Sequence, residues 1–266
     1  MKKLFLILTV VGLSSLALAH EFWLQPKKFR YAVGEEVKID FLVGENFTGQ
    51  PWDLTKHKAE LVQVVSAYGK KVLTADVKPT KENNLTYKLT NEGTHLFSMT
   101  SNVAHIELDG AKFNEYLKED GIDDILALRT TNNELDKPSR ENYSRYAKLL
   151  VQSGNKTDGD VFKRKLGFRV EIIPLTNPYT LKSGDYLECE ILFDGHPLPH
   201  QMVKVWSFIG NRAFLQDAYT ENDGKVKFPI SNTGPWMVSF VKMVKSEKQN
   251  IDYESMWASL VFGIEK

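Results

Sequence analysis

Short runs in which apolar and polar residues alternate recur through most of this chain, separated by turn-forming residues. A period of two residues is typical of a β-strand with one buried face. Before residue 110, such runs lie at 37–41, 59–64 and 85–89. Turn-forming pairs such as Tyr68-Gly69 stand between them. This spacing, with no helical pattern between the runs, predicts an antiparallel β-sandwich over residues 20–110.

The pattern changes after Asp109-Gly110, where apolar residues recur three or four positions apart. This spacing predicts short amphipathic helices around residues 113–117 and 122–128. A third apolar stripe predicts another helix within 139–153, and it consists of Tyr143, Tyr146, Ala147, Leu149 and Leu150. Ser139 would be its N-cap and Gly154 its stop. The sequence therefore predicts a small helical insertion over 111–153.

Alternating runs resume after a loop predicted over residues 154–163. They lie at 168–172, 186–191, 203–206, 224–228 and 236–240. A last run, 256–262, is apolar enough to predict a central strand. In each β region a proline, Pro26 or Pro178, precedes a strand that starts at a glycine. This weak repeat favours two related sandwiches, although ordinary turn residues would give the same pattern.

The predicted fold class is therefore mainly β. We expect two tandem immunoglobulin-like β-sandwich domains, one at 20–110 and one at 164–266, with the small α-helical insertion between them. Four aromatic residues crowd the start of the first domain, and they are Phe22, Trp23, Phe29 and Tyr31. We expect them to pack in a core and to fix the first strand.

Residues 1–19 have the organisation of an export signal. A basic start is followed by an apolar stretch and by a small-x-small cleavage signal that ends at Ala19. We expect a signal peptide at 1–19, a mature chain that begins at His20, and a periplasmic or secreted location. No later apolar run approaches the ~20 residues that a membrane span needs.

The charge of the chain is balanced. The sequence has 34 Lys and Arg residues against 34 Asp and Glu residues, and loss of Lys2 and Lys3 leaves 32 against 34. This balance gives no reason to expect nucleic acid or an anionic membrane surface as a partner.

Cleavage after Ala19 would place a histidine at the N-terminus. The free amine and the ring nitrogen of His20 could then close a chelate ring around one metal ion, and imidazole nitrogen suits copper, nickel and zinc. A tight site needs at least one further ligand. Three other histidines, His57, His95 and His105, lie near predicted turns and strands of the same domain. We predict a metal site formed by His20 with ligands drawn from these three.

Other residues with metal-ligand or nucleophile chemistry give weaker signals. His196 and His200 flank a Pro-Leu-Pro segment that excludes a helix, so a turn between strands is the simpler interpretation. Cys189 lies in an alternating run and is expected to be a small buried side chain. The chain has no GxSxG, HExxH, P-loop or GxGxxG motif. We therefore assign no catalytic residue.

Several segments together resemble one bacterial family. They are HEFWLQP directly after the leader, YLKEDGI, RENYSRYAKLL, PLTNPYTLKSGDYL and DGHPLP. The chain is similar over nearly all of its mature length to the NikM-like family of nickel-uptake-associated periplasmic domains, a domain of unknown function. The resemblance implies export, β-sandwich domains and a link to transition-metal uptake, and His20 matches the leading histidine of the family.

We therefore expect an exported soluble protein that binds a divalent transition metal (nickel, cobalt or copper) and assists its uptake or handling, with a membrane metal-uptake system as a partner. Two alternatives stay open at this stage. One is a copper-dependent oxidative enzyme that uses the N-terminal histidine. The other is a β-sandwich module that binds carbohydrate or protein without catalysis, since a fold alone does not choose a function.

Overall fold

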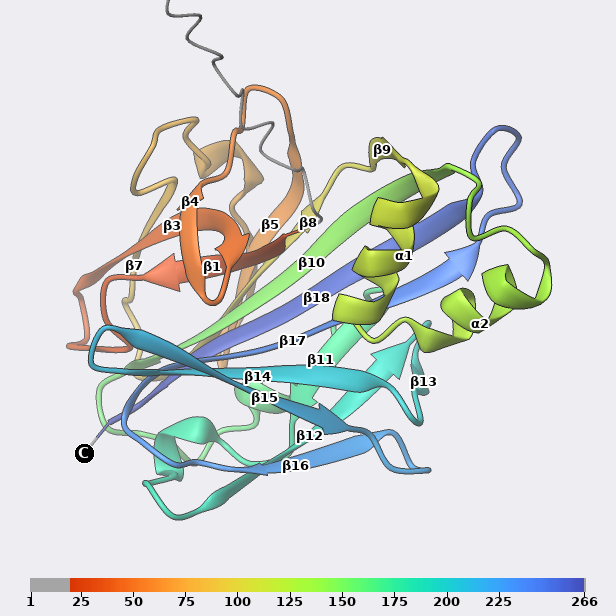
Figure 1. The fold of residues 1–266 in the computed structure, drawn as a ribbon. Helices are drawn as coiled ribbons and strands as arrows, with labels where there is room; N and C mark the ends of the chain where they lie inside the picture. The colour runs from red at the N-terminus through yellow and green to blue at the C-terminus, as the bar shows by residue number, and fades with distance from the viewer. Residues whose placement is uncertain (1–19, 266) are drawn as a thin grey trace, which may run out of the picture.

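The structure is a computed structural model that describes residues 20–265, and β-strands form most of it (Figure 1). The predicted signal peptide, residues 1–19, lies outside the described residues. Within the described range, neither α-helix has the length and hydropathy of a membrane-spanning segment. The predicted mainly β class is confirmed.

The first strands of the chain form a small antiparallel sheet. Its order is β1-β3-β4, and β7 pairs with the first half of β3. The strands are β1 (Glu21–Pro26), β3 (Glu36–Glu45), β4 (Thr48–Pro51) and β7 (Leu85–Lys88). The period-two pattern of β3 is confirmed, because Val37, Ile39 and Phe41 are all fully buried.

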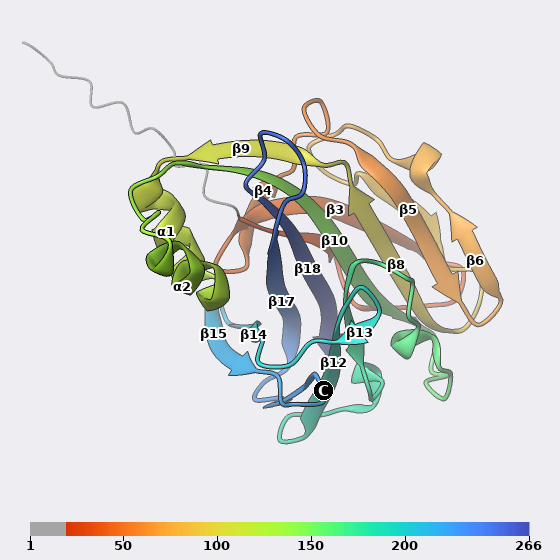
Figure 2. The same ribbon diagram turned by 90° about the vertical axis from the view of Figure 1, so that its right-hand side faces the viewer.

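A ten-stranded sheet runs through the middle of the molecule (Figures 1 and 2). Its order is β15-β14-β17-β18-β10-β8-β5-β6, with β2 and β9 also paired to β10. The strands are β2 (Arg30–Tyr31), β5 (Ala59–Ser66), β6 (Gly69–Val72), β8 (Gly93–Ser101), β9 (Ala104–Leu108), β10 (Ser139–Ser153), β14 (Met202–Ile209), β15 (Arg212–Tyr219), β17 (Gly234–Lys245) and β18 (Tyr253–Ile264).

A third sheet and three short 3-10 helices complete the β structure. The sheet has the order β11-β12-β13, with β16 also paired to β12. Its strands are β11 (Val170–Pro174), β12 (Tyr186–Phe193), β13 (His196–Pro197) and β16 (Lys225–Pro229). The 3-10 helices are η1 (Thr74–Asp76), η2 (Val161–Lys163) and η3 (Pro178–Thr180).

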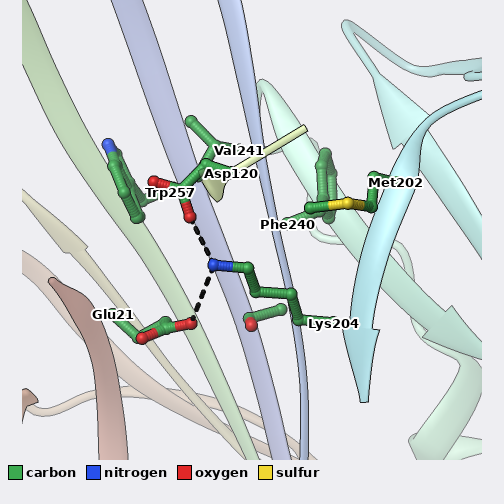
Figure 3. A pocket seen from close by; sticks show the side chains of 8 residues that line it. Glu21, Asp120, Met202, Lys204, Phe240, Val241 and Trp257 are labelled. Atoms are coloured by element: carbon green, nitrogen blue, oxygen red, sulfur yellow. Dashed lines mark hydrogen bonds and ion pairs between the residues drawn. The ribbon is translucent and has the colours of Figure 1, made fainter. Parts of the chain in front are cut away.

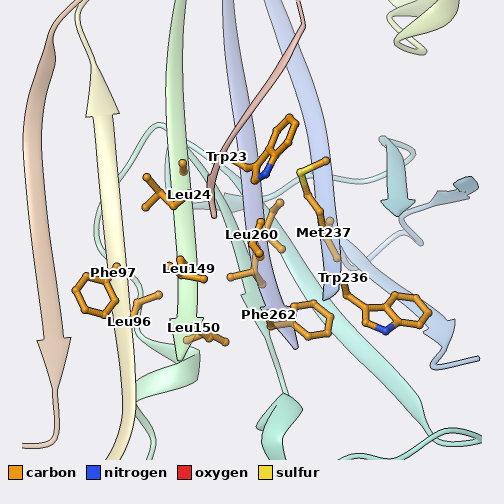
Figure 4. Packing of buried hydrophobic residues seen from close by; sticks show 14 of the residues in the cluster. Trp23, Leu24, Leu96, Phe97, Leu149, Leu150, Trp236, Met237, Leu260 and Phe262 are labelled. Atoms are coloured by element: carbon orange, nitrogen blue, oxygen red, sulfur yellow. The ribbon is translucent and has the colours of Figure 1, made fainter. Parts of the chain in front are cut away.

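The central sheet takes strands from both halves of the sequence. β10 and β18 pair in parallel, with Glu141 opposite Tyr253 at one end and Leu149 opposite Val261 at the other. One continuous hydrophobic core lies along them, with side chains from β1, β8, β10, β17 and β18 packed together (Figure 4). The sheet therefore differs from the predicted tandem arrangement, in which each half would form sheets of its own.

The predicted helical insertion is correct only in its first part. The helices α1 (Gly110–Glu119) and α2 (Asp123–Thr131) lie where the spacing of apolar residues predicts them. α1 packs through Phe113 and Tyr116 against Tyr253 and Trp257 of β18. The predicted helix within 139–153 is wrong, because these residues form β10, the longest strand described.

The physical reason for this error is that β10 is a central strand covered on both faces. Its second half, Ala147–Ser153, is continuously buried, and a continuously buried segment has no period-two pattern that separates a strand from a helix. In its first half the buried positions are polar, since Ser139, Glu141 and Arg145 point inward. The alternation of buried and half-buried positions is therefore present in the first half of β10, but the hydrophobicity of its residues does not reveal it.

The predicted packing of the N-terminal aromatic residues is confirmed. Phe22, Trp23, Phe29 and Tyr31 are each no more than 8% exposed. Phe22 contacts the ring of Trp52 edge to face, with 4.9 Å between the ring centroids. This packing fixes β1 across the central sheet, and it fixes with it the position of the residues at the start of β1.

Candidate functional site

His20 stands directly before β1 and beside the end of β3. Glu21 is paired with Gly44, so His20 lies next to Glu45, the last residue of β3. His20 Nδ1 is 2.9 Å from Glu45 Oε1, and the two side chains are 27% and 54% exposed. The two side chains are therefore partly exposed, whereas the Nδ1 atom of His20 is itself buried.

A tight hairpin holds Glu45 in place. Asn46 and Phe47 connect β3 to β4 with φ angles of 53° and 51°, and two consecutive positive φ values are the signature of a two-residue hairpin turn. Phe47 is buried against Trp23, with 5.5 Å between the ring centroids. The turn is therefore anchored to β1 itself, and this anchoring sets the spacing between His20 and Glu45.

The next residue, Glu21, is buried at 7% exposure. Its Oε1 is 3.8 Å from Nζ of Lys204, and the same ammonium is 2.6 Å from Oδ1 of Asp120. Figure 3 shows both carboxylates pointing toward the lysine head group. Three segments that are distant in the sequence, β1, β14 and the end of α1, meet at this ammonium.

Asp120 is positioned by the end of α1. It is the C-cap residue, and its backbone N–H donates to the carbonyl oxygen of Tyr116. The chain then turns at Gly121, which has a φ of 64°. A Cβ at this glycine would lie 2.6 Å from Sδ and 2.7 Å from Cβ of Met202 on β14. Only glycine accommodates both the left-handed backbone and the close approach of β14.

We expect Gly121→Ala to lower the free energy of unfolding by about 1–3 kcal/mol, because the added methyl group overpacks a left-handed turn. The measurement is urea unfolding followed by circular dichroism. Gly159→Ala is the matched control, since a Cβ there meets no atom within 4 Å. Equal stability of the two variants would contradict the assigned role of Gly121.

A cavity of about 300 Å³ opens between these elements. Its lining includes four carboxylates and one cation, namely Glu21, Glu45, Glu119, Asp120 and Lys204. Asn46, Tyr116, Trp206 and Leu215 complete the wall. A second cavity of about 10 Å³, enough for one water molecule, lies deeper beside Glu21, Lys204 and Ser239.

Burial and pairing shift the pKa values in this cluster. Burial raises the pKa of Glu21 from 4.5 to about 7, although the nearby Lys204 opposes the shift. Burial also raises the pKa of Asp120. Burial disfavours the ammonium of Lys204, but Asp120 and Glu21 outweigh this effect and raise its pKa. The lysine is therefore held firmly in its charged form, as the one cation of an acidic site.

A buried polar network supports the wall of the cavity. The Tyr116 hydroxyl donates to Oε1 of Glu141 at 3.2 Å, and the Ser255 hydroxyl donates to the same oxygen. Trp257 Nε1 donates to Ser255 at 3.2 Å. Burial raises the pKa of Glu141 to about 7, against the lowering effect of these two hydroxyl donors. Glu141 thus holds Tyr116 against β18 from inside the protein.

The other predicted ligands have separate surroundings. His57, in the loop before β5, stacks on Trp52 with 5.3 Å between ring centroids, and burial and Arg145 lower its pKa. His95 on β8 is 1% exposed, its Nδ1 is 3.1 Å from the Gly93 carbonyl oxygen, and burial lowers its pKa. His105 on β9 is exposed, and its Nδ1 is 3.1 Å from Asn142 Oδ1.

Across residues 20–265, no group of three or more His, Cys, Asp or Glu side chains is arranged to hold a metal ion. The structure pairs His20 with Glu45 and brings none of the other predicted histidines into such a group. Their role as ligands stays a prediction. Of the remaining candidates, His196 and His200 are exposed. Cys189 is fully buried, and burial raises the pKa of its thiol, so the prediction of a small buried side chain is confirmed.

Sequence reasoning missed most of the acidic cluster. Glu21, Asp120 and Lys204 lie on three segments that are distant in the sequence. Each is adjacent to residues that are more obvious candidates for a functional site. The one available signal was a charged residue, Glu21, inside the aromatic run HEFWL, where a buried carboxylate requires a partner. The sequence offered no means to identify that partner as Lys204.

The fold and the site define a β-sheet protein whose first strand and helical segment enclose an acidic cavity. Residues 17–243 match the sequence model of a protein family that is described as a domain of unknown function (DUF4198). The chain belongs to this family, and the matched range includes every residue that lines the cavity. A search of curated proteins finds no match to the chain.

Proposed function

We propose that this chain is an exported protein that binds a divalent transition metal, nickel, cobalt or copper, at His20 and assists its uptake or handling. Processing after Ala19 would free the α-amino group, so that His20 offers two nitrogen donors. The resemblance of HEFWLQP and the later segments to the NikM-like nickel-uptake-associated family supports this choice of metals. A membrane metal-uptake system is the partner that this resemblance suggests.

The observation that carries the proposal is the pairing of His20 with Glu45. Two ligands bound at right angles to one metal ion at ~2.1 Å lie about 3 Å apart. The 2.9 Å between His20 Nδ1 and Glu45 Oε1 is close to this value. With the α-amino group, the pair gives three donors of the nitrogen and oxygen types that nickel, cobalt and copper accept. The anionic lining of the cavity favours a cation at its rim.

We expect His20→Ala to weaken binding of Ni²⁺ at least about 100-fold, because it removes the ring donor at the centre of the proposed set. The protein is produced with its leader, and the mass of its N-terminus is read before calorimetric titration with Ni²⁺, Co²⁺ and Cu²⁺. His196→Ala is the matched control, since it removes an exposed imidazole outside the proposed site.

Two results would overturn the proposal. One is equal binding by the wild-type protein and His20→Ala. The other is an exported chain that starts at a residue other than His20 and binds none of the three ions. Binding that is lost in His20→Ala and retained in His196→Ala supports it. The ion with the highest affinity would then identify the metal that the protein carries.

A further inference from the structure

The acidic cavity already contains one cation, the ammonium of Lys204. Four carboxylates and this single ammonium line the cavity, so the cluster keeps a net charge of −3 when every carboxylate is ionised. The ammonium lies deep in the cluster, because the Lys204 side chain is 16% exposed. It occupies the place at which Asp120 and Glu21 converge (Figure 3).

The contacts of Lys204 are unequal. Its Nζ donates to Asp120 Oδ1 at 2.6 Å but is 3.8 Å from Glu21 Oε1, which is too long for a hydrogen bond. Glu21 Oε1 has no hydrogen-bond partner, although the residue is 7% exposed. Buried carboxylates without a hydrogen bond are rare and costly. Glu21 therefore has an oxygen atom at the cavity that can still accept a hydrogen bond or bind a cation.

We propose that Lys204 is a built-in competitor for the metal, so that binding of a divalent cation displaces its ammonium from Glu21 and Asp120. This inference rests on the proposed function. In the metal-free protein the single positive charge of Lys204 balances one of the two inner carboxylate charges. When a divalent ion enters beside His20 and Glu45, Glu21 and Asp120 turn toward it, and the lysine moves away from the doubly charged ion.

The surroundings of Lys204 allow this exchange. Lysine carries a compact charge on a flexible four-carbon stem, so its head group can move while the backbone of β14 stays in place. The cavity of about 300 Å³ gives the ammonium room to move toward solvent.

The test compares the affinity of the processed protein for Ni²⁺ before and after Lys204 is replaced. We expect Lys204→Met to bind Ni²⁺ about 5- to 150-fold more tightly, the range typical of coupled sites. Lys204→Arg keeps the positive charge and should bind with the affinity of the wild-type protein. Equal affinity of all three proteins, or the same gain in both variants, overturns the proposal.

A second measurement uses the wild-type protein and does not depend on the folding of a variant. Zn²⁺ is diamagnetic, and the ε-carbon signal of Lys204 can be followed by NMR as Zn²⁺ is added. We expect this signal to move in step with zinc occupancy, and to stay unchanged in His20→Ala. An unmoved signal at full zinc occupancy overturns the competitor role but leaves the proposed function intact. Absence of Ni²⁺, Co²⁺ and Cu²⁺ binding in the wild-type protein overturns the proposed function itself.

Discussion

Replacing Glu171 with alanine is expected to lower the free energy of unfolding by about 3–5 kcal/mol, because it leaves a buried ammonium without its partner. Glu171 Oε2 is 2.6 Å from Nζ of Lys148, and the two side chains are 3% and 4% exposed. The carboxylate also accepts hydrogen bonds from the backbone N–H groups of Leu166, Gly167 and Phe168. The measurement is urea unfolding at pH 7, monitored by circular dichroism and tryptophan fluorescence.

The double variant Lys148→Met/Glu171→Gln is the matched control. The glutamine oxygen keeps an acceptor for the three backbone donors, and methionine removes the buried charge without leaving a large void. We expect it to recover most of the stability that Glu171→Ala loses. A loss below about 1 kcal/mol in Glu171→Ala would contradict the assignment, because a pair of that strength is typical of the exposed surface.

This ion pair also connects the two halves of the sequence. Lys148 belongs to β10 of the central sheet, and Glu171 belongs to β11 of the third sheet. A single cooperative unfolding transition that shifts as a whole in Glu171→Ala is therefore expected. Two separate transitions would indicate halves that unfold independently, as the tandem prediction implies.

Much of the fold could be predicted because local patterns of apolar and polar residues indicate the individual strands. The alternating runs at 37–41 and 186–191 form parts of β3 and β12, and the apolar run at 256–262 lies in the central strand β18. The shared sheet could not be predicted in the same way. The parallel pairing of β10 with β18 joins residues more than a hundred positions apart, and no local pattern encodes that distance.

The same contrast between local patterns and long-range contacts applies to the candidate site. His20 could be found because the leader and its cleavage signal are local features of the sequence. Lys204 and Asp120 are 84 residues apart, and their contact arises only when the turn at Gly121 packs against β14. Asp120 also follows an exposed glutamate at the end of a helix, where solvated acidic residues are ordinary. An ion pair that forms only through tertiary packing could therefore not be predicted from the sequence.

The second large effect concerns pH and the buried carboxyl group of Glu141. Burial raises its pKa in the folded protein from 4.5 to about 7, so between these pH values the folded state keeps a proton that the unfolded state releases. The stabilising contribution is complete below pH 4.5 and is lost as the pH rises through about 7. Glu21 acts with the same sign, since its pKa is also raised to about 7.

We therefore expect Glu141→Gln to flatten the pH dependence of stability between pH 5 and 8, because the amide stays neutral throughout. Relative to wild type, the variant should gain about 3 kcal/mol across this window. The measurement is urea unfolding at four pH values. The slope should be reduced and not abolished, since Glu21 still titrates in the variant.

The matched control is Glu107→Gln, which removes the same charge from an exposed position on the neighbouring strand β9. It should follow the pH profile of the wild-type protein, because it leaves the buried carboxyl group of Glu141 in place. Parallel profiles for wild type and Glu141→Gln would show that Glu141 is ionised in the folded protein. Tyr116 and Ser255 would then donate to a carboxylate, and the cavity wall at α1 would rest on a buried charge.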